Sequence, residues 1–315
     1  MNMRVGSRYL GAFAAFLSVT APAFAQGKHY IALGDSYPLG YTTSAAPPTN
    51  GDTGYVGLYA DFLATLNNGI RPTLVNTSVS GDTTTSFTTG TTSLITDTPA
   101  NLFDAPLRDQ ARNTNYSVAP TPQLNFFNDA VDNILNNGGT VDYITLQIGG
   151  NDFIGLLAQD NFRNVFTPDQ QQAVLAQQFT ALGNNYTAIL TAIRTKVPTA
   201  RVFTIGYADV FAGLGALNPV PQSGLLTANA NAIIQGVSQS LGATYVDISA
   251  PFAGNELLYT RIGTLDGGFP NVHPTPLGHQ VIAAQLITAS APEPGTFALL
   301  LPIAAGVIAL RRRTH

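Results

Sequence analysis

The sequence predicts an α/β protein with one central parallel sheet of about five strands and helices on both faces. Short apolar runs of four to six residues alternate along the chain with longer segments of helical periodicity, the pattern of β-α-β units. Polar or glycine-containing turns follow the first three apolar runs, as expected at the ends of parallel strands. No internal repeat divides the pattern, so a single domain over about residues 26–290 accounts for it.

The elements can be placed along the chain in order. Strands are expected at residues 29–33, 73–77, 143–148, 201–205 and 243–246. Helices are expected at residues 55–66, 124–135, 170–195 and 224–241, and a last helix at 277–287 closes the fold. Residues 82–122 and 153–169 lack clear periodicity and are expected to be irregular loops, which in compact domains often carry function.

Three polar or glycine positions follow the first three expected strands. Ser36 follows the first strand, Gly81 the second and Asn151 the third. In open parallel sheets, ligands bind outside the carboxyl ends of the strands. We therefore expect these three residues to lie on one rim of the sheet.

Composition excludes several classes of site. The 315 residues are 45% apolar, which is ample for a core, and include no cysteine, so disulfides, thiolate metal ligands and cysteine nucleophiles are excluded. With four histidines in the whole chain, neither a metal nor an organic cofactor is expected. Without the two terminal segments described next, nine basic and 17 acidic residues leave a net charge of −8, which disfavours a nucleic-acid partner.

Residues 1–25 have the form of a signal peptide. Arg4 and Arg8 precede an apolar stretch, and Ala23-Phe24-Ala25 has the small-x-small pattern of a signal-peptidase site. The sequence therefore predicts export, with a mature start near residue 26.

Residues 291–315 combine three features in a fixed order. Pro292-Glu293-Pro294 comes first, an apolar run of 14 residues spans 297–310, and arginines occupy 311–313. This order resembles the PEP-type C-terminal sorting signal of Gram-negative bacteria. The resemblance implies processing by an exosortase, transient membrane association through residues 297–310, and a final location in the periplasm, on the outer surface or outside the cell. A simple anchor helix is the alternative, although the run is short for a span of about 20 residues.

Four blocks along the chain resemble those of the GDSL, or SGNH, hydrolases, in the family's order. They are IALGDSYPLGY (31–41), NTSVSGDTT (76–84), IGGND (148–152) and VHPTPLGH (272–279). The resemblance implies a flavodoxin-like three-layer αβα sandwich and ester hydrolysis through an acyl-serine. It also implies that Ser36 is the nucleophile and that an oxyanion is held by the backbone N–H groups of Ser36 and Gly81 and the side chain of Asn151.

A serine nucleophile needs a base, and histidine is suited by its near-neutral pKa. Of the four histidines, His315 lies in the tail and His29 at the far end of the first strand. His279 falls on the last helix, where a packing or capping role is the simpler interpretation. His273 precedes Pro274, which keeps a helix from starting there. We expect His273 to be the base; a surface loop histidine is the alternative.

Structural interpretations of the other motif residues stay open at this point. Gly81 could be a plain turn glycine, and Asn151 could cap a helix. Asp35 and Asp152 adjoin candidate site residues and are expected to support the turns, because carboxylates commonly accept hydrogen bonds from nearby backbone N–H groups.

The third member of a catalytic triad is uncertain from the sequence. The family usually has an aspartate three residues before the histidine, where this chain has Pro270, and Asp266 lies seven residues before His273. Asp266 could orient the imidazole, a backbone carbonyl could do so in a Ser-His dyad, or the site could be impaired. Asp247 is a weaker candidate, since its neighbours indicate a turn at the end of a strand.

Taken together, these features predict an exported serine esterase acting on carboxylic esters. The low charge and the sorting signal favour acylated carbohydrate or envelope esters, while lipid esters compete, so an esterase, a lipase and a lysophospholipase are all compatible with the motifs. A non-catalytic matrix or glycan-binding protein on the same fold is the alternative, because Pro270 stands where an aspartate is expected and a fold does not guarantee activity.

Overall fold

The computed structural model describes residues 27–42, 51–90, 121–158, 161–220, 222–266 and 269–291. The predicted signal peptide, the predicted sorting signal from residue 292 onward and its apolar run 297–310 lie outside the described residues. Within the described residues, no helix has the length and apolar composition needed to cross a membrane.

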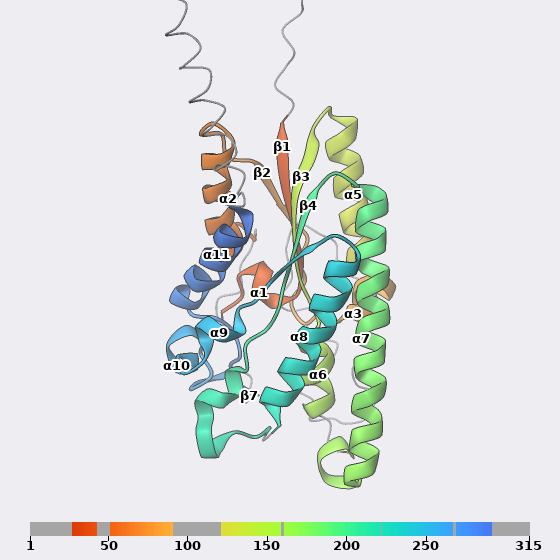
Figure 1. Cartoon of the computed structure of the whole chain (residues 1–315), viewed down its shortest axis with the longest axis vertical. Helices are drawn as coiled ribbons and strands as arrows, with labels where there is room; N and C mark the ends of the chain where they lie inside the picture. Colours follow the sequence, from red (N-terminus) through yellow and green to blue (C-terminus); the bar gives the residue numbers. More distant parts are fainter. Residues whose placement is uncertain are drawn as a thin grey trace, which may run out of the picture.

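Five parallel strands form the central sheet in the order β2-β1-β3-β4-β5. Figure 1 labels β1 to β4 in the middle of the molecule. The strands are β1 (Lys28–Gly34), β2 (Thr73–Asn76), β3 (Thr140–Gln147), β4 (Arg201–Ile205) and β5 (Thr244–Val246). All five overlap the expected positions, and the predicted fold class is confirmed.

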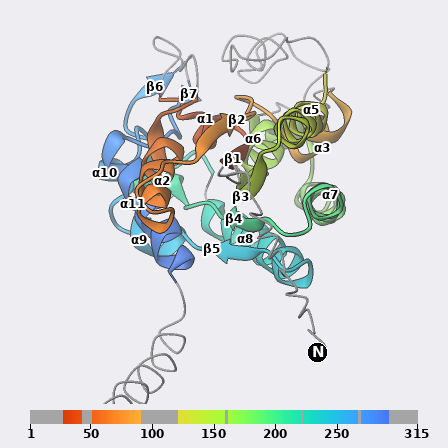
Figure 2. The same ribbon diagram turned by 90° about the horizontal axis from the view of Figure 1, so that it is seen from above.

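Helices cover both faces of the sheet, as Figure 2 shows from above. One face carries α2 (Gly54–Leu66) and α11 (Pro276–Ser290), and the other carries α5 (Gln123–Asn136), α7 (Pro168–Lys196) and α8 (Ser223–Ser240). Strand β1 joins the two layers. Its side chains alternate, so Tyr30 and Ala32 pack toward α2 while Ile31 and Leu33 pack toward α5 and α7. All four are fully buried, which explains why this strand reads as a continuous apolar run.

Side-chain caps determine where two long helices begin. Thr167 accepts a hydrogen bond from the Gln170 backbone N–H, and the Gln170 side chain accepts one from the Thr167 N–H. This capping box starts α7 at Pro168, two residues before the expected start. At α11, Thr275 accepts from the Gly278 N–H at 3.1 Å, and Pro276 is the first helical residue.

The expectation that residues 153–169 form an irregular loop is wrong. They include most of α6 (Gly150–Ala158), the π-helical turn η1 (Asn161–Val165) and the start of α7. Phe153 and Leu156 belong to α6 and are buried. Tertiary packing therefore stabilises a helix whose sequence is too short to show a clear period.

The remaining described elements are short and lie between the main ones. They are α1 (Ser36–Leu39), α3 (Thr84–Thr89), the 3₁₀ helix η2 (Val210–Leu217), α9 (Ser249–Phe252), α10 (Glu256–Tyr259) and the antiparallel pair β6 (Leu265–Asp266) and β7 (Phe269–Pro270).

The strand order places a crevice at the carboxyl ends of β1 and β3. The chain leaves β1 toward β2 on one side and later enters β3 on the other side, so the loops after β1 and β3 diverge. The described chain begins and ends at the amino ends of the strands, opposite this crevice. Gly27 precedes β1, and the Ser290 carbonyl at the end of α11 accepts a hydrogen bond from Arg201 at the start of β4.

Candidate active site

Ser36 is the first residue of α1, immediately beyond β1. Gly34 makes the turn possible because its φ is +132° and a Cβ there would lie 1.9 Å from the Gln147 carbonyl oxygen. Asp35 then caps α1 by accepting a hydrogen bond from the Tyr37 N–H at 3.0 Å. The Ser36 hydroxyl therefore lies at the rim of the sheet, on a turn held by its neighbours.

His273 reaches Ser36 from a loop more than 230 residues away in the sequence. Its Nε2 lies 2.9 Å from the Ser36 Oγ. The loop is held at the histidine and directly after it, since the His273 carbonyl accepts from the Arg261 N–H at 2.9 Å and Pro274 pairs with Thr260. This contact brings together two of the residues that the sequence singles out.

Asn271 occupies the other side of the imidazole. Its Oδ1 lies 2.8 Å from His273 Nδ1 and also accepts the His273 backbone N–H at 3.0 Å. Its Nδ2 donates to the Thr42 carbonyl at 2.9 Å, which fixes the amide so that the oxygen faces the ring. Nδ1 must therefore carry the proton, and the lone pair of Nε2 points at Ser36.

Sequence reasoning did not identify Asn271. The available signal was an Asn two residues before a histidine, since Asn side chains commonly accept a backbone N–H two residues on. The side chain is 2% exposed, so its polar atoms require partners inside the protein.

Asp266 lies close to the imidazole on the short strand β6. Its carboxylate accepts from the Tyr41 hydroxyl at 3.4 Å, and the Tyr41 ring packs on His273 with centroids 4.4 Å apart. Burial lowers the pKa of His273 below its ordinary value, and the Asp266 charge offsets part of that effect. An orienting role for Asp266 stays a prediction, which the substitutions below address.

The loops after β2 and β3 meet beside Ser36. Gly81 follows β2 with a φ of +77°, and the carbonyl of the next residue, Asp82, accepts from Asn151 Nδ2 at 2.9 Å. An amide nitrogen carries two hydrogens, so this bond also fixes the direction of the second Asn151 N–H. Asn151 lies in the first turn of α6 and is 8% exposed.

Buried carboxylates tie these turns together. Asp82 accepts from Gln123 Nε2 at 2.8 Å, and the same Gln123 side chain bonds the N–H and the carbonyl of Gly34. Asp152 accepts from the backbone and the hydroxyl of Thr84. Burial raises the pKa of Asp152 to about 6. The supporting role expected of Asp152 is confirmed by these bonds.

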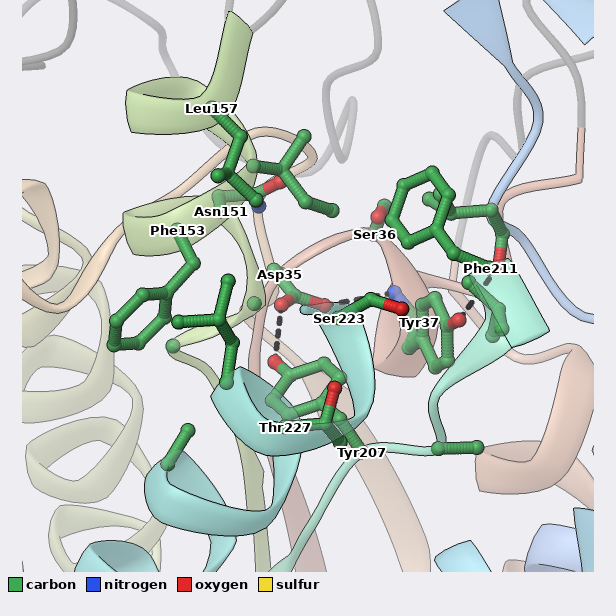
Figure 3. Close-up of a pocket in the computed structure, with 18 residues that line it drawn as sticks. Asp35, Ser36, Tyr37, Asn151, Phe153, Leu157, Tyr207, Phe211, Ser223 and Thr227 are labelled. Atoms are coloured by element: carbon green, nitrogen blue, oxygen red, sulfur yellow. Dashed lines mark hydrogen bonds between the residues drawn. The ribbon is translucent and has the colours of Figure 1, made fainter. Parts of the chain in front are cut away.

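Asp35 has a similar supporting role under Ser36. Besides the Tyr37 N–H it accepts from the Tyr207 hydroxyl at 2.5 Å (Figure 3). Burial raises the pKa of Asp35 to about 7, and the hydrogen bonds from Tyr207 and Tyr37 oppose that rise. Asp247, the weaker candidate from the sequence, accepts from Ser249 in a turn after β5.

The other described histidines lie away from Ser36. His279 is buried on α11, and its Nδ1 accepts from the Tyr55 N–H at 3.3 Å, so it packs α11 against the start of α2 as predicted. His29 bonds Gly27 and Thr140 at the beginning of β1. In the part of the chain that the structure describes, no group of three His, Cys, Asp or Glu side chains could hold a metal ion.

Comparison with known proteins gives a consistent result. Residues 32–281 match the model of the GDSL-like Lipase/Acylhydrolase family. The comparison with curated proteins found no match. Among solved structures, the lipase Lip_vut3 from a goat rumen metagenome is 17% identical with a TM-score of 0.54, over 85% of this chain and 99% of its own.

Two Streptomyces enzymes show the same fold. The extracellular lipase of Streptomyces rimosus is 19% identical with a TM-score of 0.51, over 84% of this chain and 100% of its own. The phospholipase A1 of Streptomyces albidoflavus NA297 is also 19% identical, with a TM-score of 0.50, over 85% of this chain and 100% of its own.

Proposed function

The chain belongs to the GDSL-like lipase/acylhydrolase family and is an ester-acting hydrolase, and from this premise we propose that Ser36 is its nucleophile. The observation that carries the proposal is the 2.9 Å contact between Ser36 Oγ and His273 Nε2, with Nδ1 held by Asn271. A serine hydroxyl becomes a nucleophile when an adjacent base takes its proton.

The proposed reaction is acyl transfer to water. Ser36 Oγ attacks the ester carbonyl carbon while its proton passes to His273 Nε2. The imidazolium then gives that proton to the departing alcohol oxygen, which leaves an acyl-serine. Water attacks the acyl carbon in the same way, releases the carboxylic acid and restores Ser36. Asn271 acts as a positioning residue, since it keeps the proton on Nδ1 and leaves Nε2 free to accept.

Each attack places negative charge on the carbonyl oxygen. We propose that the backbone N–H groups of Ser36 and Gly81 and the second N–H of Asn151 stabilise it. The support for this is the Asn151–Asp82 bond, which fixes the amide before substrate binds. Donors that need no rearrangement stabilise a developing charge most effectively. The proposed steps use only groups of this chain, and no cofactor or metal takes part in them.

The substrate is an ester of an acylated carbohydrate or of a lipid. We also propose that the protein is exported, cleaved by signal peptidase near residue 26 and processed by an exosortase near residue 294, after transient membrane association through residues 297–310. The described residues next to these segments, Gly27 and Ser290, lie at the amino ends of the strands, opposite the site. Mass spectrometry of both ends of the protein isolated from its host tests this; an intact full-length chain would contradict it.

The nucleophile and base are tested by labelling the purified protein with a fluorophosphonate, which reacts with activated serines. We expect Ser36→Ala to abolish labelling and His273→Ala to slow it by about a thousandfold or more. The matched control is His279→Gln, a buried histidine away from Ser36, which should label at the native rate. Native protein that is folded but neither labels nor hydrolyses short acyl esters would refute the proposal.

A further inference from the structure

A cavity of about 80 Å³ lies beside Ser36, between α6, η2 and the start of α8 (Figure 3). Side chains from all three elements form its walls. Among them are Phe153, Ile154, Leu157, Phe211, Leu226 and the small Ala230. Three of the cavity's lining residues, Phe153, Ile154 and Leu157, belong to residues 153–169, the segment expected to be irregular, which includes most of α6.

The position of the cavity relative to the proposed reacting groups indicates that it would hold the acyl part of an ester rather than the alcohol part. Ser36 and Asn151 are among its lining residues, so it adjoins the expected place of the carbonyl carbon and its oxygen. His273 reaches Ser36 from the loop before α11 and does not itself line the cavity, although the preceding residue Val272 does. Because the imidazolium must protonate the alcohol oxygen, the alcohol leaves toward His273, and the acyl group extends the other way.

The walls have no charge available for an ionic ligand. Asp35 is the one Asp, Glu, Lys or Arg among the described lining residues, and both of its oxygens accept hydrogen bonds, from Tyr37 and Tyr207. No charged residue occurs between positions 210 and 246, which include η2 and α8. A hydrocarbon chain is the ligand that such walls stabilise by burial.

The length of the α8 wall limits the chain that fits. The lining residues of α8 run from Ser223 to Ala230, about 10 Å along the helix axis at 1.5 Å per residue. An extended chain advances about 1.2 Å per bond, since extended polypeptide covers about 3.5 Å in three bonds. The wall therefore borders a chain of at most about eight carbons, of which the enclosed 80 Å³ holds about three, at about 25–30 Å³ per carbon.

We infer that this cavity is the acyl site and that it selects esters of unbranched, uncharged acyl groups from about butanoyl to octanoyl over acetyl esters. The inference rests on the proposed function and narrows its range of substrates. An acetyl group is too short to fill the cavity, so acetylated carbohydrates would be poor substrates. Each methylene buried there stabilises the transition state by an amount that raises kcat/KM about fourfold.

The test is kcat/KM of the full exported protein on p-nitrophenyl esters from acetyl to dodecanoyl. We expect a rise of about fourfold per methylene to about butanoyl, a smaller rise to about eight carbons, then a plateau or fall. Ala230→Leu should lower the octanoyl-to-acetyl ratio by about tenfold or more. Its matched control is Ala228→Leu, which adds the same side chain to an exposed position of α8 and should leave the ratio unchanged.

If Ala230→Leu does not fold, Leu157→Ala tests the inference instead. Leu157 is a half-buried side chain of α6 that lines the cavity, and shortening it should widen the cavity and move the preference to longer acyl chains. A native preference for acetyl, or a ratio that neither variant changes, would overturn the acyl-site inference while fluorophosphonate labelling of Ser36 kept the proposed function. Loss of labelling and of all ester hydrolysis in the native protein would instead refute the proposed function itself.

Discussion

The two sides of the candidate site are held in different ways. On the Ser36 side, the buried carboxylates that follow β1, β2 and β3 are Asp35, Asp82 and Asp152. They accept hydrogen bonds from Tyr37, Gln123 and Thr84, respectively. On the His273 side, the group at the imidazole is the neutral amide of Asn271.

This difference separates the structural carboxylates from the group that orients the proposed base. A buried carboxylate requires several donors, and here backbone N–H groups, hydroxyls and the Gln123 amide supply them. At His273 the buried acceptor is the Asn271 amide, and an amide costs less to bury than an ion. A carboxylate near a site in the sequence therefore does not identify the group that orients the histidine.

The largest effect is expected on the Ser36 side. Asn151→Ala removes a proposed oxyanion donor, and we expect kcat to fall by about a hundred- to thousandfold. Steady-state kinetics on a short acyl ester measures it. Asn185→Ala is the control, since Asn185 bonds the Thr84 and Thr85 hydroxyls farther from Ser36. Equal losses in the two variants would show that Asn151 acts only through the loop structure.

On the His273 side, Asn271→Ala leaves the Nδ1 proton without its acceptor. A lost partner of a buried polar group costs about 1–3 kcal/mol, so kcat/KM should fall about 5- to 150-fold. The same assay on Asp266→Asn should show a loss of at most about fivefold, as for a partly exposed charge. A larger loss in Asp266→Asn than in Asn271→Ala would make Asp266 the orienting group after all.

The smallest effect concerns pH. Because burial lowers the pKa of His273, the neutral base should persist below pH 6.5, its ordinary pKa, and kcat/KM should fall only at more acidic pH. Asn271→Asp puts a carboxylate at Nδ1, favours the imidazolium and should raise the midpoint of that fall by about one unit.

The variant also separates His273 from Asp35, whose pKa of about 7 falls in the same range. Only a midpoint that belongs to His273 should move with Asn271→Asp. Because burial lowers the pKa of His273 to about 3, a pH–rate profile from about pH 3 to 8 decides, and a native midpoint at or above 6.5 would contradict the expected direction.

Much of the fold could be predicted because its signals are local. The buried run of β1 and the period of α7 are visible in consecutive residues, and caps such as Thr167 shift the boundaries by only a residue or two. Helix α6 was missed because nine residues carry too little periodicity, and its stability comes from the packing of Phe153 and Leu156.

By itself the sequence determined that polar or glycine-containing turns follow the first three strands. It also determined the residue types for acyl transfer and the family resemblance, since all of these depend on residues adjacent in the chain. The tertiary structure decided that Asn271 rather than another acceptor lies at Nδ1, and that an apolar cavity separates α6 from α8 beside Ser36. Both depend on how loops and helices distant in the sequence approach one another, and hydrogen bonds and cavities are determined by that approach rather than by local pattern.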